Sequence, residues 1–208
     1  MMKKNLIIVG AGGHGQVVAE IADLMSLWYS ILFLDDDLEK SKETKVSVIG
    51  TISEAFDFKE THDFFVAIGN NFTREKISNK LIELGCNIVT IIHPQSIIGK
   101  DVQIGAGTVV MPGSVINNSS KIGLGCIINT SSSIDHENII DDYVHISPGV
   151  RCGGNVTVGK RTWLGIGSVV VNNVRITSDC IIGAAGLVIK DVIHSGTYIG
   201  VPIKRLES

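Results

Sequence analysis

From Ile92 onward, an aliphatic residue returns at every sixth position, and the run continues to Val188 with a single interruption at Cys152. Small or β-branched residues follow most of these positions four places later. A period of six fits neither an α-helix nor a lone β-strand, and self-similarity at a fixed short period is typical of a stacked solenoid. The pattern predicts a solenoid over about half of the chain. If three of these six-residue repeats, or hexads, form one coil, residues eighteen apart stack directly.

The first third of the chain has a different pattern. The short aliphatic strand Leu6–Val9 leads into the glycine-rich segment Gly10–Gly15, after which apolar residues recur at helical spacing. The other elements expected here are strands at Ser30–Leu34, Phe64–Ile68 and Asn87–Ile92, and a helix that Asn71 or Thr73 caps and Gly85 ends. Strands that alternate with helices predict a small parallel sheet, whose ligands bind at the carboxyl ends of the strands. The sequence thus predicts a Rossmann-like α/β domain followed by an all-β solenoid.

Composition narrows the function classes. The formal net charge of −3 and the absence of any lysine or arginine run argue against a nucleic-acid partner and against an anionic membrane surface. Lys3 and Lys4 precede too few apolar residues for a signal peptide, so we expect a cytoplasmic protein. The four cysteines form no C-x-x-C pair and are expected to be reduced, structural thiols.

Two segments carry candidate chemistry. Gly10–Gly15, with Asp35 about twenty residues later, has the outline of a dinucleotide fingerprint, but the short sheet leaves room for one nucleotide only. A tight turn followed by a solvated acidic bend is the alternative. His136 and Glu137 are the third and fourth residues of the hexad that starts at Ile134, so both are expected to point outward at a corner. A histidine beside a carboxylate suits a general base, and a plain surface pair is the alternative.

A second histidine lies on the opposite side of the solenoid. His145 follows His136 by nine residues, which is half a coil, so one chain cannot easily bring the two together. Three residues stand near it at eighteen-residue intervals, namely Pro148, Ile166 and Ala184, and three glycines lie beside this column: Gly149, Gly167 and Gly183. Such a column predicts a shallow groove for an elongated ligand. The alternative is that glycine is simply common at solenoid corners.

Motifs in order along practically the whole chain resemble those of one family. They are Gly10–Gly15, Phe33–Asp36, Ala67–Asn71, Asn129–Glu137, Gly153–Val156 and Gly200–Pro202. The family is that of the bacterial sugar acetyltransferases, which includes sialic acid O-acetyltransferases and N-acetyltransferases of nucleotide-linked 4-amino sugars. Within it, the chain most resembles the UDP-4-amino-sugar N-acetyltransferases of the bacillosamine pathway. The resemblance implies a left-handed parallel β-helix, a trimer, acetyl-CoA as donor and a nucleotide-sugar site in the N-terminal domain. The expected reaction needs no metal, and the half-coil separation of His136 and His145 predicts active sites at the subunit boundaries of a homotrimer.

The resemblance also assigns segments and residues. It implies a nucleotide-sugar-binding domain at 1–91, an acetyl-CoA-binding and catalytic domain at 92–193, and a tail at 194–208. His136 corresponds to the catalytic base and Glu137 to the residue that raises its basicity. Contacts to the nucleotide sugar correspond to Gly12, Gly13, His14, Asp35, Asp36 and Gly69, and contacts to acetyl-CoA to His145, Ile166 and Ala184. Relatives carry glycine at the Ala184 position, and many carry alanine at the Ile203 position, so the local shape of the coenzyme site stays open.

The expected reaction is direct acetyl transfer within a ternary complex. His136 removes the proton from the sugar amine as its nitrogen attacks the thioester, and His145 of a neighbouring chain stabilises the oxyanion. Three alternatives remain: O-acetylation of a free or CMP-linked sialic acid, a zinc enzyme of the carbonic-anhydrase type, and a non-catalytic nucleotide-sugar-binding module. The sequence identifies neither the nucleotide, whether UDP, GDP, dTDP or CMP, nor the acetylated position.

Overall fold

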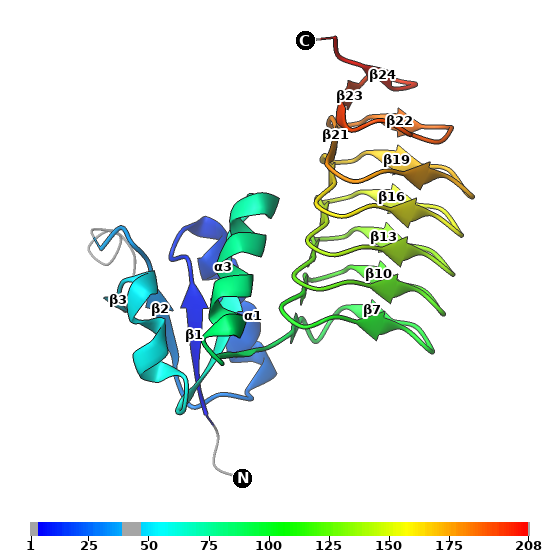
Figure 1. The fold of residues 1–208 in the computed structure, drawn as a ribbon. Helices are drawn as coiled ribbons and strands as arrows, with labels where there is room; N and C mark the ends of the chain where they lie inside the picture. Colours follow the sequence, from blue (N-terminus) through cyan, green and yellow to red (C-terminus); the bar gives the residue numbers. More distant parts are fainter. Residues whose placement is uncertain (1–3, 39–46, 208) are drawn as a thin grey trace. The chain divides into compact units, whose positions relative to one another are not determined.

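The computed structural model describes residues 4–38 and 47–207. The chain folds into two compact units, Met1–Pro94 and Gln95–Ser208 (Figure 1). The functions expected for the segments 1–91, 92–193 and 194–208 stay predictions. None of the described helices is long and apolar enough to cross a membrane.

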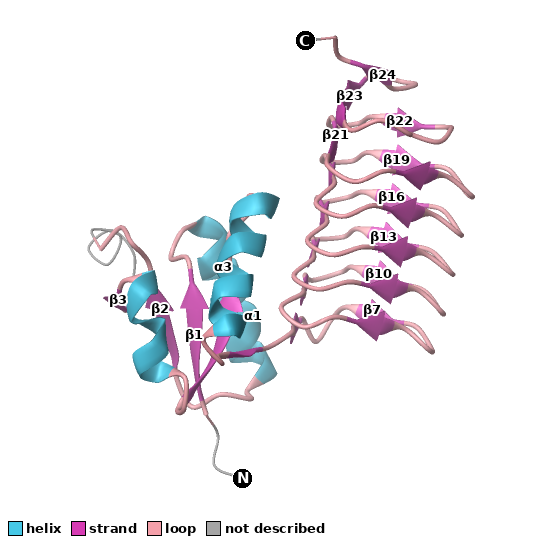
Figure 2. Ribbon diagram, in the orientation of Figure 1, coloured by secondary structure: helices cyan, strands magenta, loops and turns pink. Residues whose placement is uncertain are grey.

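The first unit is a parallel sheet flanked by helices (Figure 2). Its elements are β1 (Asn5–Val9), α1 (Gly13–Met25), β2 (Ile31–Leu34), β3 (Val48–Gly50), the 3-10 helix η1 (Ile52–Phe58), β4 (His62–Val66), α3 (Asn71–Glu83), β5 (Asn87–Ile88) and β6 (Ile91–Ile92). The strand order of the sheet is β3-β2-β1-β4-β5, and neighbouring strands are parallel. This confirms the predicted α/β sheet. The loops that follow β1, β2 and β4 therefore share its carboxyl edge.

Some details of this unit differ from the sequence-based expectations. The sequence does not predict β3 or η1, and β4 begins and ends two residues before the expected strand. The strand expected at Asn87–Ile92 is interrupted after Ile88. The expectation for the helix cap is wrong as well: the N-cap of α3 is Asn70, whose side-chain oxygen accepts the backbone N–H of Thr73 at 2.9 Å. Asn70 has the extended backbone that an N-cap needs, whereas the helix has already begun at Asn71.

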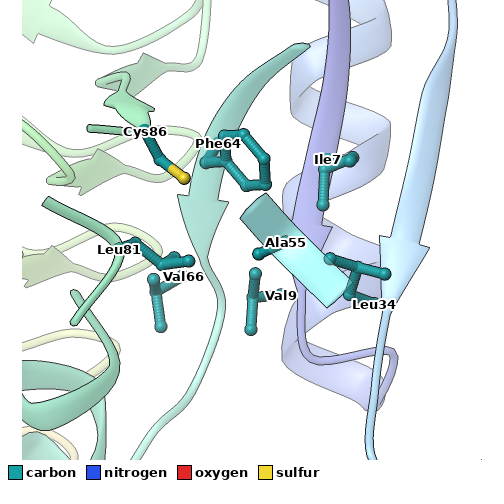
Figure 3. Close-up of a cluster of buried hydrophobic side chains, with 8 residues drawn as sticks. All are labelled: Ile7, Val9, Leu34, Ala55, Phe64, Val66, Leu81 and Cys86. Atoms are coloured by element: carbon teal, nitrogen blue, oxygen red, sulfur yellow. The ribbon is translucent and has the colours of Figure 1, made fainter. Parts of the chain in front are cut away.

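One hydrophobic cluster of the first unit lies between the sheet and the elements that cover one of its faces. Figure 3 shows the cluster, which consists of Ile7, Val9, Leu34, Ala55, Phe64, Val66, Leu81 and Cys86. All four residues of Leu6–Val9 are fully buried. A central strand of a parallel sheet is covered on both faces, which explains why β1 is continuously aliphatic and does not alternate with polar residues.

The second unit is a left-handed parallel β-helix with three faces (Figure 1). One face contains β7 (Ile97–Ile98), β10 (Val115–Ile116), β13 (Ser133–Ile134), β16 (Arg151–Cys152), β19 (Val169–Val170) and β22 (Leu187–Val188). The next contains β8 (Gln103–Ile104), β11 (Lys121–Ile122), β14 (Ile139–Ile140), β17 (Thr157–Val158) and β20 (Arg175–Ile176). The third contains β9 (Val109–Val110), β12 (Ile127–Ile128), β15 (His145–Ile146), β18 (Trp163–Leu164) and β21 (Cys180–Ile182), followed by β23 (Gly196–Ile199) and β24 (Lys204–Arg205).

The strands pair at an offset of eighteen residues, as in the parallel pairs Ile116 to Ile134 and Ile134 to Cys152. This confirms that three hexads form one coil. The repeating aliphatic residues point inward, and Ile134 and Leu164 are fully buried. Cys152 occupies the same inward position, and burial raises the pKa of its thiol to about 12. It therefore stays protonated and packs as a small apolar residue. All four cysteines are free thiols, as the sequence predicts.

Candidate functional site

His136 and Glu137 form a hydrogen-bonded pair at an exposed corner of the β-helix. The corner follows β13, and Glu137 adopts the left-handed backbone conformation, with a φ of 57°. The side chains are 48% and 65% exposed, and Nδ1 of His136 lies 3.0 Å from Oε2 of Glu137. The predicted outward orientation of both residues is confirmed. A carboxylate only accepts hydrogen bonds, so Nδ1 carries the proton of a neutral imidazole and Nε2 is left as the proton acceptor.

The backbone around His136 is fixed by a second carboxylate. Oδ1 of Asp135 accepts the backbone N–H of His136 at 2.9 Å and the side-chain amide of Asn117, one coil earlier, at 2.8 Å. The hydrogen bond from Asn117, followed by that from His136, lowers the pKa of Asp135. The carboxylate therefore remains ionised at neutral pH and keeps both hydrogen bonds at this corner.

The imidazole ring of His136 rests on Gly154, the residue eighteen positions later. A Cβ atom at Gly154 would lie 2.5 Å from Nε2 and 2.6 Å from Cε1 of His136. The sequence motif includes Gly154, but no role for it follows from the sequence. The signal that could have found it is the eighteen-residue offset itself, because a glycine directly below an outward histidine leaves room for the ring.

His145 lies on another face of the β-helix, on β15. Its ring stacks on Trp163, with ring centroids 5.6 Å apart and an interplanar angle of 6°. Nε2 of His145 lies 3.4 Å from the side-chain amide of Asn129, and the indole N–H of Trp163 donates to Oγ of Ser147 at 2.7 Å. Trp163 stands eighteen residues after His145, so the coil period places it there, although the sequence analysis gave it no role. These contacts hold the His145 ring in one orientation.

The column beside His145 is stacked at the expected eighteen-residue interval, but its third corner residue is Ala185 and not Gly183. The backbone N–H of Gly167 donates to the carbonyl of Pro148, and that of Ala185 donates to the carbonyl of Ile166. The left-handed corner residues are Gly149, Gly167 and Ala185, with φ values of 70°, 65° and 55°. Ile166 is 63% exposed. The column therefore presents an exposed apolar side chain next to two glycines.

In residues 4–38 and 47–207, no three His, Cys, Asp or Glu side chains gather where they could hold a metal ion.

The glycines of the first unit fall into two classes. Gly10 has a φ of +106°, and a Cβ atom at Gly15 would overlap the carbonyl oxygen of Gly10, so the fold itself requires both. At Gly12, Gly13 and Gly69, in contrast, a Cβ atom would meet nothing within 4 Å. These three glycines line open space at the carboxyl edge of the sheet. They are the positions at which a ligand, and not the chain, would require glycine.

Asp35 and Asp36 are engaged differently. Asp35 is buried, and its carboxylate accepts the backbone N–H of Ala11 at 2.8 Å and that of Asp37 at 2.9 Å. It ties the glycine-rich loop to the end of β2. Asp36 is exposed, and its Oδ1 accepts the backbone N–H of Ile52 at 3.0 Å. The structure thus brings both residues to the predicted edge, with Asp36 the more accessible of the two.

His14 lies on the first turn of α1 and is held neutral. Burial, with a smaller contribution from the positive charge of Arg74, lowers the pKa of His14 to about 4. Its Nε2 atom is buried and has no hydrogen-bond partner among the described residues. Arg74 is fully buried and donates to the carbonyls of Ile68 and Gly69, at 2.9 and 3.0 Å, and to the side chain of Asn71 at 2.8 Å. Arg74 therefore shapes the Gly69 loop, a role with no signal in the sequence pattern.

Comparisons with known proteins agree with this geometry. Residues 5–81 match the family described as the PglD N-terminal domain. Over 174 residues the chain is 29% identical to GDP-perosamine N-acetyltransferase from Escherichia coli O157:H7, a match that covers 80% of this chain and 78% of the relative.

Solved structures match over nearly the whole chain. The acetyltransferase domain of PglB from Neisseria gonorrhoeae, in complex with acetyl coenzyme A, has a TM-score of 0.93 and 34% identity, with coverage of 99% of this chain and 100% of that one. PerB from Caulobacter crescentus, in complex with CoA and GDP-perosamine, has a TM-score of 0.89 and 34% identity, with coverage of 98% and 97%. The chain therefore belongs to the hexapeptide-repeat family of nucleotide-amino-sugar N-acetyltransferases, and it is an acetyl-CoA-dependent acetyltransferase.

Proposed function

We propose that this acetyltransferase acts on the amino group of a nucleotide-linked 4-amino-4,6-dideoxy sugar, with His136 as the general base. The observation that carries the proposal is the 3.0 Å hydrogen bond between His136 and Glu137 at an exposed corner. It leaves Nε2 of His136 free to accept a proton, and the carboxylate stabilises the imidazolium that forms. Relatives named for GDP-perosamine support the class of acceptor.

In the proposed reaction, His136 is the protein group that takes up and returns the proton. The nitrogen of the neutral sugar amine attacks the carbonyl carbon of the thioester, and Nε2 of His136 takes a proton from that nitrogen. The tetrahedral intermediate then collapses, the carbon–sulfur bond breaks, and the imidazolium gives its proton to the departing CoA thiolate. A positioned base of this kind contributes about two to four orders of magnitude in rate.

The nucleotide sugar is assigned to the carboxyl edge of the sheet in the first unit. Gly12 and Gly13 stand at the N-terminus of α1, where backbone N–H groups without helical partners favour an anionic diphosphate. The open space at Gly12, Gly13 and Gly69 supports this placement. So does Nε2 of His14, a buried polar atom for which the described residues provide no hydrogen-bond partner. Asp36 is the carboxylate with access to the ligand, and Asp35 supports the loop.

Acetyl-CoA is assigned to the column of Pro148, Ile166 and Ala184, with His145 near the thioester carbonyl. His136 and His145 occupy different sides of one β-helix, whereas both must lie within about 3 Å of the reacting atoms. A complete site therefore needs His136 of one chain and His145 of a neighbour. A closed ring with one repeated interface supplies this at every boundary, and triangular β-helices favour a trimer.

The test is an acetyl-CoA consumption assay on a panel of acceptors. The panel contains UDP-, GDP- and dTDP-linked 4-amino sugars together with free and CMP-linked sialic acid, and His136→Gln is the matched control. We expect turnover with at least one amino sugar, loss of that turnover in the control, and none with the sialic acids. Turnover with sialic acid alone would replace N-acetylation by O-acetylation. Absence of turnover with every acceptor would overturn the proposed substrate class.

A further inference from the structure

We infer that Asn138 is a positioning residue for acetyl transfer, because it fixes the corner that presents His136. The inference rests on the proposed role of His136 as the base. Asn138 stands two residues after His136, and its side chain is fully buried inside the β-helix. It does not reach the surface and therefore acts only through its neighbours.

Asn138 is unusual for its place in the coil. Residues at this hexad position stack at eighteen-residue intervals, and the other members of its column are Val102, Ser120, Val156, Val174 and Val192. Valine fits the apolar interior at no polar cost, whereas a buried amide is costly unless its polar atoms are hydrogen-bonded. The contacts of the Asn138 amide therefore decide what this side chain does.

The amide of Asn138 bridges two successive coils. Nδ2 donates to the carbonyl oxygens of Asp135 at 2.7 Å and Gly153 at 2.9 Å, with a longer contact to the carbonyl of His136 at 3.3 Å. Oδ1 accepts the backbone N–H of Val156, in the following coil, at 3.1 Å. Both donors and the acceptor of the side chain are thus used inside the protein.

These contacts act on the two peptide groups that flank the Cα atom of His136. The carbonyl of Asp135 belongs to the peptide group before that atom, and the carbonyl of His136 belongs to the one after it. Holding both planes fixes the direction in which the imidazole leaves the backbone. The third carbonyl, that of Gly153, precedes Gly154, on which the ring rests. One buried side chain therefore ties the base to the surface that supports it.

Thr108 provides a matched comparison elsewhere in the solenoid. It holds the same hexad position and is also fully buried. Its Oγ1 donates to the carbonyl of Gly123 and accepts the N–H of Cys126, both at 2.9 Å. Asn138 makes the corresponding bonds to Gly153 and Val156, at the same sequence offsets. Because asparagine is longer, it also reaches back to its own corner, and that extra reach is the difference to be tested.

The experiment compares Asn138→Ser and Asn138→Val with Thr108→Val, all in the full chain. We expect Asn138→Ser to lower kcat about ten- to a hundredfold, with KM for both substrates within about twofold, because a displaced base loses reactivity and not binding. Thr108→Val is expected to lower the thermal midpoint about as much as Asn138→Ser does, but to leave kcat within about twofold of the wild type. If Asn138→Ser keeps kcat within about threefold of the wild type, or changes KM instead, the inference is wrong.

His136→Gln, measured alongside, separates this inference from the proposed function. Activity of His136→Gln within about tenfold of the wild type would remove the base assignment whatever Asn138 does. An inactive His136→Gln with fully active Asn138 variants would refute the role of Asn138 alone. Should both Asn138 variants fail to fold, NMR of the wild-type chain decides. Slow exchange of the Asn138 side-chain amide protons is expected, and rapid exchange with solvent would overturn the contacts on which the inference stands.

Discussion

The imidazole ring of His136 occupies the space that a side chain on Gly154 would need. The distance of 2.5 Å between Nε2 and the position of such a Cβ atom is shorter than real nonbonded contacts of carbon. The two residues stand in successive coils at the same corner, and the backbone N–H of Asn155 donates to the carbonyl of His136 at 2.9 Å. The glycine therefore sets how closely the proposed base can lie against the β-helix.

Gly154→Ala should displace the His136 ring without unfolding the β-helix, because Gly154 does not have a left-handed backbone. We expect kcat to fall about ten- to a hundredfold while KM for acetyl-CoA stays within about twofold. Steady-state kinetics on both substrates measures this. The double variant Gly154→Ala with His136→Gln is the control and should lose no more activity than His136→Gln alone, since both changes act on one group. Additive losses would show that Gly154 acts elsewhere.

Glu137→Gln should lower kcat and leave KM for acetyl-CoA within about twofold of the wild type, as steady-state kinetics on both substrates would measure. The carboxylate is hydrogen-bonded to the imidazole and stabilises the positive charge that the ring gains as it takes the proton of the amine, whereas a neutral amide gives less stabilisation. Asp135→Asn removes one negative charge from the neighbouring position and keeps an acceptor for the His136 N–H, which makes it the matched control. Equal kcat values for the two variants would show that Glu137 has no specific part in the reaction.

Gly12→Ala and Gly69→Ala should raise KM for the nucleotide sugar about tenfold or more and leave KM for acetyl-CoA unchanged. A methyl group at these positions meets no atom of the chain, so the thermal midpoint should stay within about 2 °C of the wild type. Gly15→Ala is the contrasting control, because its Cβ atom would overlap the Gly10 carbonyl and should destabilise the fold by about 2–4 kcal/mol. Unchanged sugar binding in both open-space variants would move the ligand away from this edge.

His14 should make the first unit less stable in mild acid. Its pKa is about 4 in the folded chain and 6.5 in the unfolded chain, so the unfolded state takes up the proton first as the pH falls. The stability is complete above pH 6.5 and is lost as the pH falls through about 4, with a loss of about 2 kcal/mol between pH 7.5 and 5. Urea unfolding at several pH values should show this loss in the wild type and not in His14→Gln. If the free energy of unfolding depended on pH equally in the two proteins, His14 would take up its proton as readily in the folded state as in the unfolded state.

Complementation should reveal an active site shared between chains. His136→Ala and His145→Ala proteins are each expected to be inactive, whereas mixed assemblies formed after dissociation and reassociation should regain part of the wild-type activity. Some boundaries in a mixed ring carry both native histidines, because each residue comes from a different chain. Confirmed subunit exchange without any regained activity would refute the shared site.

Several features of the fold follow from local sequence alone. The six-residue period needs only an aliphatic side chain that points inward at each turn of the solenoid, so it reveals both the architecture and the stacking of residues eighteen apart. The same period places His136 and Glu137 at an outward corner and His145 on another face. In the first unit, the alternation of strands and helices predicts the carboxyl edge that gathers the loops around Gly12 and Asp35.

What only the tertiary structure decides are contacts between groups whose separation in the sequence carries no regular signal. The carboxylate of Asp35 accepts a hydrogen bond from the backbone N–H of Ala11, and buried Arg74 donates one to the carbonyl of Gly69. Residue type alone does not reveal these partners, because they depend on how the chain packs. Likewise, an asparagine in a column that otherwise contains four valines and one serine is recognised as a support for His136 only once its four contacts are seen. The period of the sequence determines which residues stack, whereas the polar contacts that orient them depend on atoms that folding brings within hydrogen-bond distance.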